Sequence, residues 1–189
     1  SDELGRSMPH DVNDGLFKAL IRDLAVTNVA PDRNWAYKGQ VRKINATVEN
    51  QGEMVETSVT VKAYYDGNLI GTLIVPSLNP NESKTVMFTW DTSSATACNN
   101  YTISANVVPV PYESDLGDNT LIDGKVKIRI VGEVNGDGIV NILDLVQVIA
   151  AFRTIPGDPR WNECADVNGD GKVDILDLVI TVMHFRSAC

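Results

Sequence analysis

The sequence predicts a mainly β fold with a small α module, namely a seven-stranded β-sandwich followed by a pair of loop–helix units. Two observations predict this class. Short runs of alternating polar and apolar residues, separated by turn signals, fill the chain from Asp23 to Val131. One acidic pattern occurs twice between Glu133 and Val179, and each copy is followed by an apolar run. The chain has 189 residues, 43% of them hydrophobic, which suffices for the core of one or two domains.

The predicted organisation has three parts: an N-terminal arm or linker at residues 1–21, the sandwich at 22–131 and an acidic module at 132–189. The net charge of −9 argues against nucleic acid and anionic membrane surfaces as partners. Nine acidic and three basic residues lie between Glu133 and Asp177, a net charge of −6, so most of the excess charge lies in the module. No apolar run is long enough to span a bilayer.

The N-terminal arm carries one weak signal. Leu16, Phe17, Leu20 and Ile21 form an apolar face at helical spacing, preceded by polar residues that can cap a helix. We expect either a linker or docked arm, or a segment that is exchanged with a neighbouring copy of the chain.

The sandwich region contains seven predicted strands. The hairpin signal Asp66-Gly67-Asn68 joins the third strand to the fourth. Phe88 and Trp90 alternate in the fifth strand and are expected in the core. Short strands at this spacing are typical of an Ig-like arrangement. The predicted strands are Asp23–Val29, Val41–Asn50, Ser58–Tyr65, Leu69–Val75, Lys84–Thr92, Tyr101–Val108 and Leu121–Val131.

The repeated acidic pattern has the spacing of a calcium-binding loop. Oxygen-bearing side chains fall at loop positions 1, 3, 5, 9 and 12, and position 7 offers its backbone carbonyl. Gly138 and Gly171 allow the sharp bend at position 6. One copy could be a polar hairpin turn, but two copies predict two calcium ions. The predicted ligands are Glu133, Asn135, Asp137, Ile139 (carbonyl), Asn141 and Asp144 in the first loop, and Asp166, Asn168, Asp170, Lys172 (carbonyl), Asp174 and Asp177 in the second.

Each loop is followed by an apolar stripe at helical spacing, and we expect the two stripes to pack on each other as the core of the module. The stripes are Leu145, Val148, Ile149 and Phe152 in the first copy, and Leu178, Thr181, Val182 and Phe185 in the second.

Two further groups in the sandwich region have alternative interpretations. Trp35 and Tyr37 either anchor their loop or bind a sugar or a partner. Asp115, Asp118 and Asp123 either form a solvated turn, which we favour, or hold a third calcium ion.

Three glycosylation sequons, at Asn45, Asn81 and Asn100, favour an extracellular or cell-surface glycoprotein. Millimolar external calcium suits the same location. The only histidines are His10 and His184, and no nucleophile elbow, phosphate loop or zinc motif is present. We therefore expect no enzymatic activity.

The duplicated loop, with an exiting helix and Asp in place of the usual EF-hand Glu at position 12, resembles the dockerin domain. The resemblance implies two calcium-stabilised EF-hand-type loop–helix units, related by a pseudo-twofold axis, that dock onto a partner called a cohesin. Cellulosomal dockerins carry small hydroxyl residues at positions 10 and 11. Here those positions are Ile142-Leu143 and Ile175-Leu176, which favours an apolar or intramolecular contact.

The sandwich region resembles a second family. The stretches Asp23–Val29, Val48–Gly52 and Asp118–Thr120 are similar to the CARDB domain, an Ig-like adhesion-related module of prokaryotic surface proteins. The resemblance spans about Arg22 to Val131 and implies a spacer or adhesion role without catalysis.

Three cysteines, Cys98, Cys164 and Cys189, allow three pairings. The hairpin of the last two predicted strands places Cys98 near Val131, where the module begins. If the dockerin resemblance holds, its second helix returns to the same place and brings Cys189 there. We therefore favour the Cys98–Cys189 pair, with Cys164–Cys189 or no disulfide as alternatives.

The sequence as a whole predicts a non-catalytic, extracellular, calcium-binding adhesion or assembly protein. Its partner is either another copy of itself, head to tail in a filament or array, or a cohesin on another protein. A third hypothesis, an accessory carbohydrate-binding module of a degradative enzyme complex, rests on the dockerin resemblance and the loop aromatics.

Overall fold

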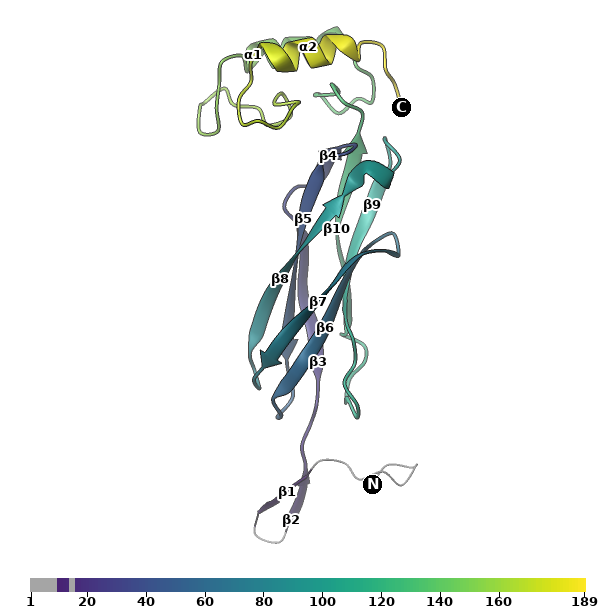
Figure 1. The fold of residues 1–189 in the computed structure, drawn as a ribbon, viewed down its shortest axis with the longest axis vertical. Coiled ribbons are helices and arrows are strands. Elements are labelled where there is room, and N and C mark those ends of the chain that lie inside the picture. The colour runs from purple at the N-terminus through teal and green to yellow at the C-terminus, as the bar shows by residue number, and fades with distance from the viewer. Residues whose placement is uncertain (1–9, 14–15) are drawn as a thin grey trace. The chain divides into compact units, whose positions relative to one another are not determined.

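The computed structural model describes residues 10–13 and 16–189, and the chain divides into two compact units (Figure 1). The first unit contains the described residues up to Arg33, together with 42–90 and 102–125. The second contains residues 34–41, 91–101 and 126–189. Three segments that the sequence analysis assigned to the sandwich, 34–41, 91–101 and 126–131, therefore belong with the acidic module.

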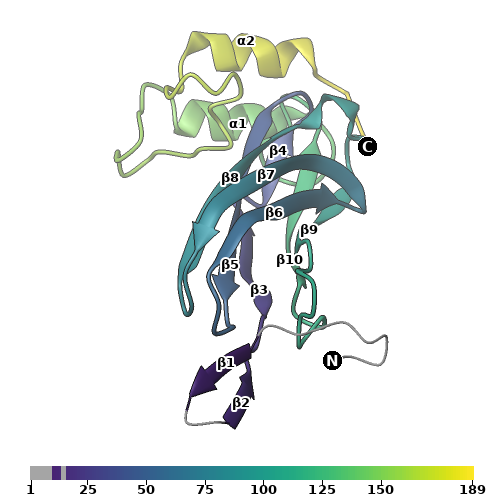
Figure 2. The ribbon, with the colours of Figure 1, turned by 60° about the horizontal axis from the view of Figure 1, so that its bottom comes forward.

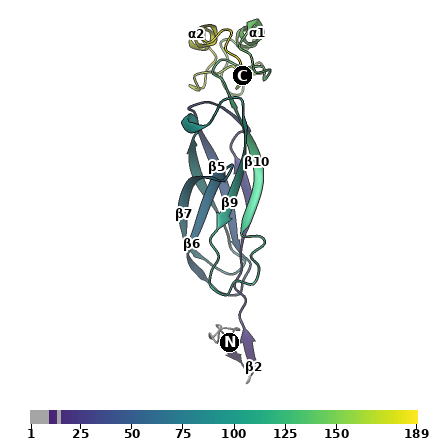
Figure 3. The ribbon, with the colours of Figure 1, turned by 90° about the vertical axis from the view of Figure 1, so that its right-hand side faces the viewer.

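Two sheets form the β-sandwich, so the predicted fold class is confirmed. All seven predicted strands are present, with their ends shifted by a few residues. The three-stranded sheet has the order β3 (Leu24–Pro31), β5 (Val41–Asn50), β8 (Ser83–Asp91). The five-stranded sheet has the order β4 (Trp35–Tyr37), β10 (Thr120–Arg129), β9 (Asn100–Val107), β6 (Glu56–Tyr65), β7 (Asn68–Leu78). Figure 3 labels β10, β9, β6 and β7 of this sheet.

The alternating pattern of the strands places one face of each sheet in the core. In β5, Ile44, Ala46 and Val48 are fully buried and alternate with half-buried polar residues. Trp90 is also buried, as predicted, and its ring stacks on Tyr65 with centroids 4.7 Å apart.

The predicted hairpin at Asp66-Gly67 is confirmed. Tyr65 pairs with Asn68 across a two-residue loop, and both loop residues have positive φ, 43° at Asp66 and 80° at Gly67. This is the backbone of the tight turns that match the twist of paired strands, and it explains why an Asp-Gly dipeptide joins β6 to β7.

One strand and one hairpin were not predicted. Strand β4 is only three residues long, too short for a periodic signal, and pairs in parallel with the end of β10. In the arm, β1 (His10–Asn13) and β2 (Leu16–Ala19) pair antiparallel, so the helical spacing predicted for Leu16 onward is wrong. The Asp-Gly dipeptide between these two runs is itself a hairpin signal, and a four-residue apolar spacing is too short to identify a helix.

The second unit contains the only α-helices among the described residues, α1 (Ile142–Ala150) and α2 (Ile175–Met183), which lie side by side (Figure 2). Each begins with a capping box, Asn141 with Asp144 in α1 and Asp174 with Asp177 in α2. A short 3₁₀ turn, η1 (Thr92–Ser94), also belongs to this unit. Neither helix is long and apolar enough to cross a membrane.

The two loop–helix repeats hold each other through short antiparallel bridges. The Val140 N–H donates to the Ser187 carbonyl, beyond α2, at 2.8 Å. The Val173 N–H donates in the equivalent way to the Thr154 carbonyl, beyond α1, at 3.0 Å. Each loop is thus bonded to the segment that follows the other helix, and the predicted duplication is also a structural one.

We predict that Arg22→Met destabilises the sandwich. Arg22 Nε donates to Glu56 Oε1 at 2.7 Å, and the Glu56 side chain is almost fully buried. The substitution leaves a buried carboxylate without its counter-ion, and we expect it to lower the free energy of unfolding by about 2–3 kcal/mol. Denaturant unfolding followed by tryptophan fluorescence measures this. Lys43→Met, at an exposed position of β5, is the charge-matched control, and equal losses in the two variants would contradict the prediction.

Candidate metal centre and docking face

The second loop is closed by the carboxylate of its first residue, Asp166. Oδ1 accepts the N–H groups of Gly169 at 2.9 Å and Asp170 at 3.1 Å, and Oδ2 accepts that of Gly171 at 2.9 Å. These bonds curl the backbone around the carboxylate. Gly171, at position 6, has a φ of +85°, which the bend requires and other residues resist.

The last residue of each loop, Asp144 or Asp177, lies beneath it. Asp177 Oδ1 accepts from Val167 N at 2.8 Å, and Oδ2 accepts from Asp174 N at 2.8 Å. Asp144 makes the equivalent bonds in the first loop, to Val134 N at 2.7 Å. Both carboxylates are 0% exposed, and their partners in the described structure are neutral N–H groups.

The other predicted side chains of the loops lie at the exposed rim. Asp137 and Asp170, at position 5, each accept the N–H group two residues ahead. At position 3, Asn135 and Asn168 each donate to that same carboxylate, at 3.0 and 3.1 Å. The hydrogen bond from the Ile139 N–H is the main reason that the pKa of Asp137 is lowered.

The residues fit a calcium ion in their chemistry. Two fully buried carboxylates without a cationic partner are costly unless a cation compensates them. Burial and then the neighbouring Asp177 charge raise the pKa of Asp166, which a bound cation would reverse. In the described part of the chain, no three acidic, histidine or cysteine side chains gather closely enough to share one ion.

Trp35 and Tyr37 belong to the buried core of the acidic module. They are 5% and 1% exposed and pack with Val134, Val148 and other module residues. The Tyr37 hydroxyl donates to the carbonyls of Cys164 at 2.8 Å and Glu133 at 3.1 Å, next to the starts of both loops. Burial raises the pKa of this phenol. The two aromatics are therefore core residues, and the carbohydrate hypothesis loses the side chains on which it rested.

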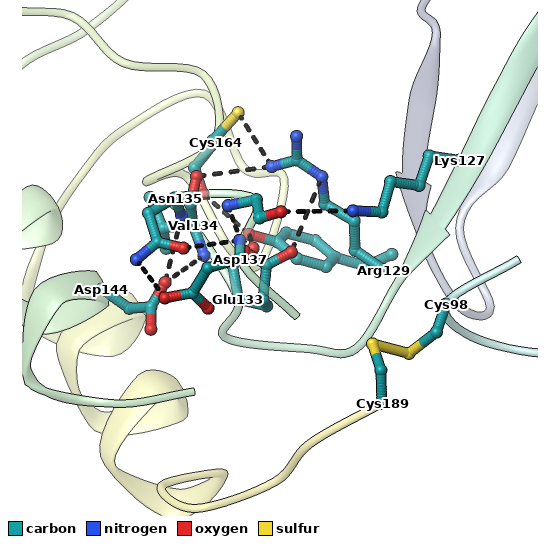
Figure 4. A network of polar contacts seen from close by, with 12 residues as sticks. Cys98, Lys127, Arg129, Glu133, Val134, Asn135, Asp137, Asp144, Cys164 and Cys189 are labelled. Carbon is teal, nitrogen blue, oxygen red and sulfur yellow. Dashed lines mark hydrogen bonds and ion pairs between the residues drawn. A yellow bond between two sulfur atoms is a disulfide. The ribbon is translucent and has the colours of Figure 1, made fainter. Parts of the chain in front are cut away.

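The structure joins Cys98 to Cys189, with Cα atoms 5.5 Å apart, which is the pairing that the sequence analysis favoured. The Cys189 N–H donates to Gly138 O at 2.9 Å, so the segment after α2 returns to the first loop. Cys164 is a free, half-buried thiol, and burial raises its pKa. Figure 4 shows the disulfide beside the first loop.

The predicted helix stripes are only partly correct. Val148 and Thr181 are fully buried, but Ile149, Val182 and Phe185 are exposed. The core is filled instead by small residues after the helix and around the loops, such as Ala151 and Ala165, against Trp35 and Tyr37. A broad apolar face of both helices is left exposed. It consists of Ile142, Leu143, Val146, Ile149, Ile175, Leu176, Val179, Val182 and Met183, and is called the helix face below.

The remaining predicted sites lie in loops and strands of other regions. Asp115 accepts the Gly117 N–H in the segment before β10, and Asp123 accepts the Gly124 N–H within β10. Asp118 Oδ1 is buried without a hydrogen-bond partner among the described residues, so this carboxylate does not fit the solvated turn that we favoured. Among the sequon residues, Asn81 and Asn100 are exposed, whereas Asn45 is half-buried in β5.

Two family models match the chain. The CARDB model matches residues 21–122, and the dockerin type I domain model matches residues 131–184. Both predicted resemblances are confirmed, in the predicted order. No curated protein is similar enough to count as a match.

Solved structures similar to the chain include two from archaea. A domain of a Methanosarcina acetivorans protein, solved by NMR, is 31% identical over 57% of this chain and 92% of its own length, with a TM-score of 0.47. The CARDB domain of a Pyrococcus furiosus protein, also solved by NMR, is 22% identical over 58% of this chain and 97% of its own length, with a TM-score of 0.48.

We predict that chelation of calcium melts the helices of the second unit. Without the ions, the net −6 charge between Glu133 and Asp177 is opposed only by a small core and backbone hydrogen bonds. Far-ultraviolet circular dichroism should lose its helical signal with excess chelator and regain it when calcium is added back. An unchanged helical signal would contradict the role of calcium.

We also predict that Tyr37→Phe weakens the module by about 1–2 kcal/mol, because the change leaves the buried Glu133 carbonyl and the part-buried Cys164 carbonyl without the hydroxyl donor that they share. Thermal unfolding in saturating calcium measures the loss. Tyr64→Phe, in β6, is the matched control that removes a hydroxyl elsewhere. A Tyr37→Phe chain as stable as its control would show that the hydroxyl does not support the loops.

Proposed function

We propose, because the chain belongs to the CARDB family and carries a dockerin type I domain, that it is an extracellular, calcium-binding assembly protein without catalytic activity. Dockerin domains bind calcium and dock onto cohesin partners. Both domain types are typical of extracellular or cell-surface proteins and are typically non-catalytic. The two exposed sequons, Asn81 and Asn100, support a glycosylated surface, which glycopeptide mass spectrometry of the native protein would reveal.

We propose two calcium ions, one in each acidic loop, held by the twelve residues predicted from the sequence. The ions would supply the positive charge that the buried Asp144 and Asp177 carboxylates lack. The same carboxylates begin the helices through their capping boxes, so the chain couples metal binding to helix formation. The role of calcium in this proposal is structural.

The helix face is the observation that carries the docking proposal. Ile142 and Leu143 are 60% and 57% exposed, and Ile175 and Leu176, at the same positions of the second repeat, are 59% and 53% exposed. Further exposed apolar residues follow at helical spacing, Val146 and Ile149 on α1 and Val179 and Val182 on α2. An apolar surface of this kind on a folded protein is typical of a protein–protein contact. The partner must therefore present an apolar surface.

A second copy of the chain is the partner that we favour. The helix face is built from two equivalent helices. Residues of α1 in one copy can therefore contact the equivalent residues of α2 in a second copy. A head-to-tail contact with a different surface would instead propagate and give a filament or a surface array. Either contact would bury the uncharged positions 10 and 11 of both repeats.

A cohesin on another protein is the second candidate, and the dockerin match favours it. In that case the chain would be the anchoring part of a larger surface complex. The isoleucine and leucine residues at positions 10 and 11 would then require a cohesin whose docking surface is apolar rather than hydroxyl-binding.

We predict that Val146→Asp combined with Val179→Asp abolishes association. Both residues lie at the centre of the helix face, at 54% and 46% exposure. Light scattering after size exclusion should show calcium-dependent oligomers for the native chain and monomers for the variant, and electron microscopy distinguishes filaments from closed dimers. Ile122→Asp, on an exposed part of β10, is the matched control.

The outcomes separate the two partners. A native chain that stays monomeric in calcium, but binds an immobilised cohesin through the same two valines, would establish the second candidate. A monomer that binds no cohesin would contradict docking through the helix face.

A further inference from the structure

The two calcium loops differ in the charge that surrounds their first residue. Asp166, which opens the second loop, has only backbone N–H groups as hydrogen-bond partners among the described residues. Glu133, which opens the first loop, accepts the Gly136 N–H with Oε1, and its Oε2 lies 3.8 Å from Arg129 Nε. Glu133 is 1% exposed, so this ion pair lies out of water and is weakly screened.

Contacts within the second unit hold the Arg129 side chain in place. Its guanidinium lies 4.9 Å from the centre of the Trp35 ring, and Nη1 donates to the Val134 carbonyl at 3.3 Å. Nη1 also lies 3.6 Å from Cys164 Sγ. Trp35 therefore supports the Arg129 guanidinium at the start of the first loop. Figure 4 shows the dashed contacts of Arg129 with the residues around Glu133 and Cys164.

Lys127, two residues earlier on the same strand, adds a second cation. Its Nζ donates to the Gly136 carbonyl at 3.2 Å, which places its charge beside the first loop. In the described part of the chain, no lysine or arginine side chain contacts the second loop in the equivalent place. A Cβ added at Gly169, which corresponds to Gly136, would lie 3.6 Å from the neutral side-chain amide of Gln40. The exposed Lys172 makes no bond to a loop carboxylate in the described structure.

We propose that Arg129, assisted by Lys127, is a built-in counter-ion that lowers the calcium affinity of the first loop and holds that loop in shape before the ion binds. Calcium then fills the second loop first and the first loop at higher concentration. This inference rests on the proposed calcium ligands. It makes Arg129 a positioning residue that determines the affinity of one site, so the module has one tight ion and one that responds to external calcium.

The positive charge of Arg129 determines the direction of its effect on the calcium affinity of the first loop. A calcium ion that enters the first loop must share Glu133 with a guanidinium and approach a positive charge. Arg129→Gln removes both penalties, so we expect the first site to bind calcium roughly fivefold more tightly. Without calcium, the same change leaves Glu133 buried and unpaired, and the metal-free module should be less stable. A residue with a merely structural role would weaken the module both with and without calcium.

The test is a calcium titration of the full chain by calorimetry, with NMR of the amides of Gly138 and Gly171 to report each loop separately. In the native chain, Gly171 should respond at lower calcium than Gly138. In Arg129→Gln the two responses should converge, and saturating calcium should raise the unfolding temperature by more than in the native chain. Lys125→Gln, which removes a charge from the same strand away from the loop, is the control and should leave both responses unchanged.

A double variant shows whether Arg129 acts through Glu133. In a Glu133→Gln background, Arg129→Gln should no longer tighten the first site. Unchanged or weaker calcium binding in Arg129→Gln overturns the inference, and so does a native chain in which Gly138 responds first or together with Gly171. The order in which Gly138 and Gly171 respond to calcium in the native chain tests the inference even if Arg129→Gln fails to fold. If neither amide responds to calcium, it is the proposed calcium function that fails.

Discussion

Electrostatic repulsion within the acidic module is the constraint on which the structure of the second unit depends. Each loop folds its backbone N–H groups around one carboxylate and buries another, Asp144 or Asp177, beneath the bend. The buried carboxylates also cap the helices, so a helix can begin only where a loop has closed. Loop closure and helix formation are therefore coupled through the same carboxylates.

The core of this unit depends on residues outside the duplicated sequence. Trp35 and Tyr37 fill the space beneath the loops, and the Cys98–Cys189 disulfide closes the same unit. Because Tyr37 contacts the carbonyls of Glu133 and Cys164, one hydroxyl serves both repeats. The small side chains Ala151 and Ala165 leave room for these aromatics. The large apolar residues of the helices are consequently not needed for the core, which is why they remain on the surface.

The sequence predicted those features that depend on local spacing. Seven strands, the Asp66-Gly67 turn and the two loops each have a short-range signal, so their positions could be predicted closely. The pairing of Cys98 with Cys189 followed from strand order combined with the dockerin resemblance.

The features that sequence analysis missed depend on contacts between distant residues. Strand β4 exists because it pairs with the end of β10, and its three residues carry no periodicity of their own. The phase of the helix stripes was wrong because Trp35 and Tyr37 decide which face of each helix is buried. The alternation of residues 125–130 predicted a strand, but only the fold shows that Arg129 meets Glu133.

The number of calcium ions bound by the folded chain tests the central claim most directly. Native mass spectrometry of the full chain in millimolar calcium counts the bound ions by mass. Two ions per chain, reduced to one by Asp166→Asn, are what the two acidic loops predict. A chain that is folded and helical with no bound calcium would contradict the account, because the buried carboxylates would then need no metal.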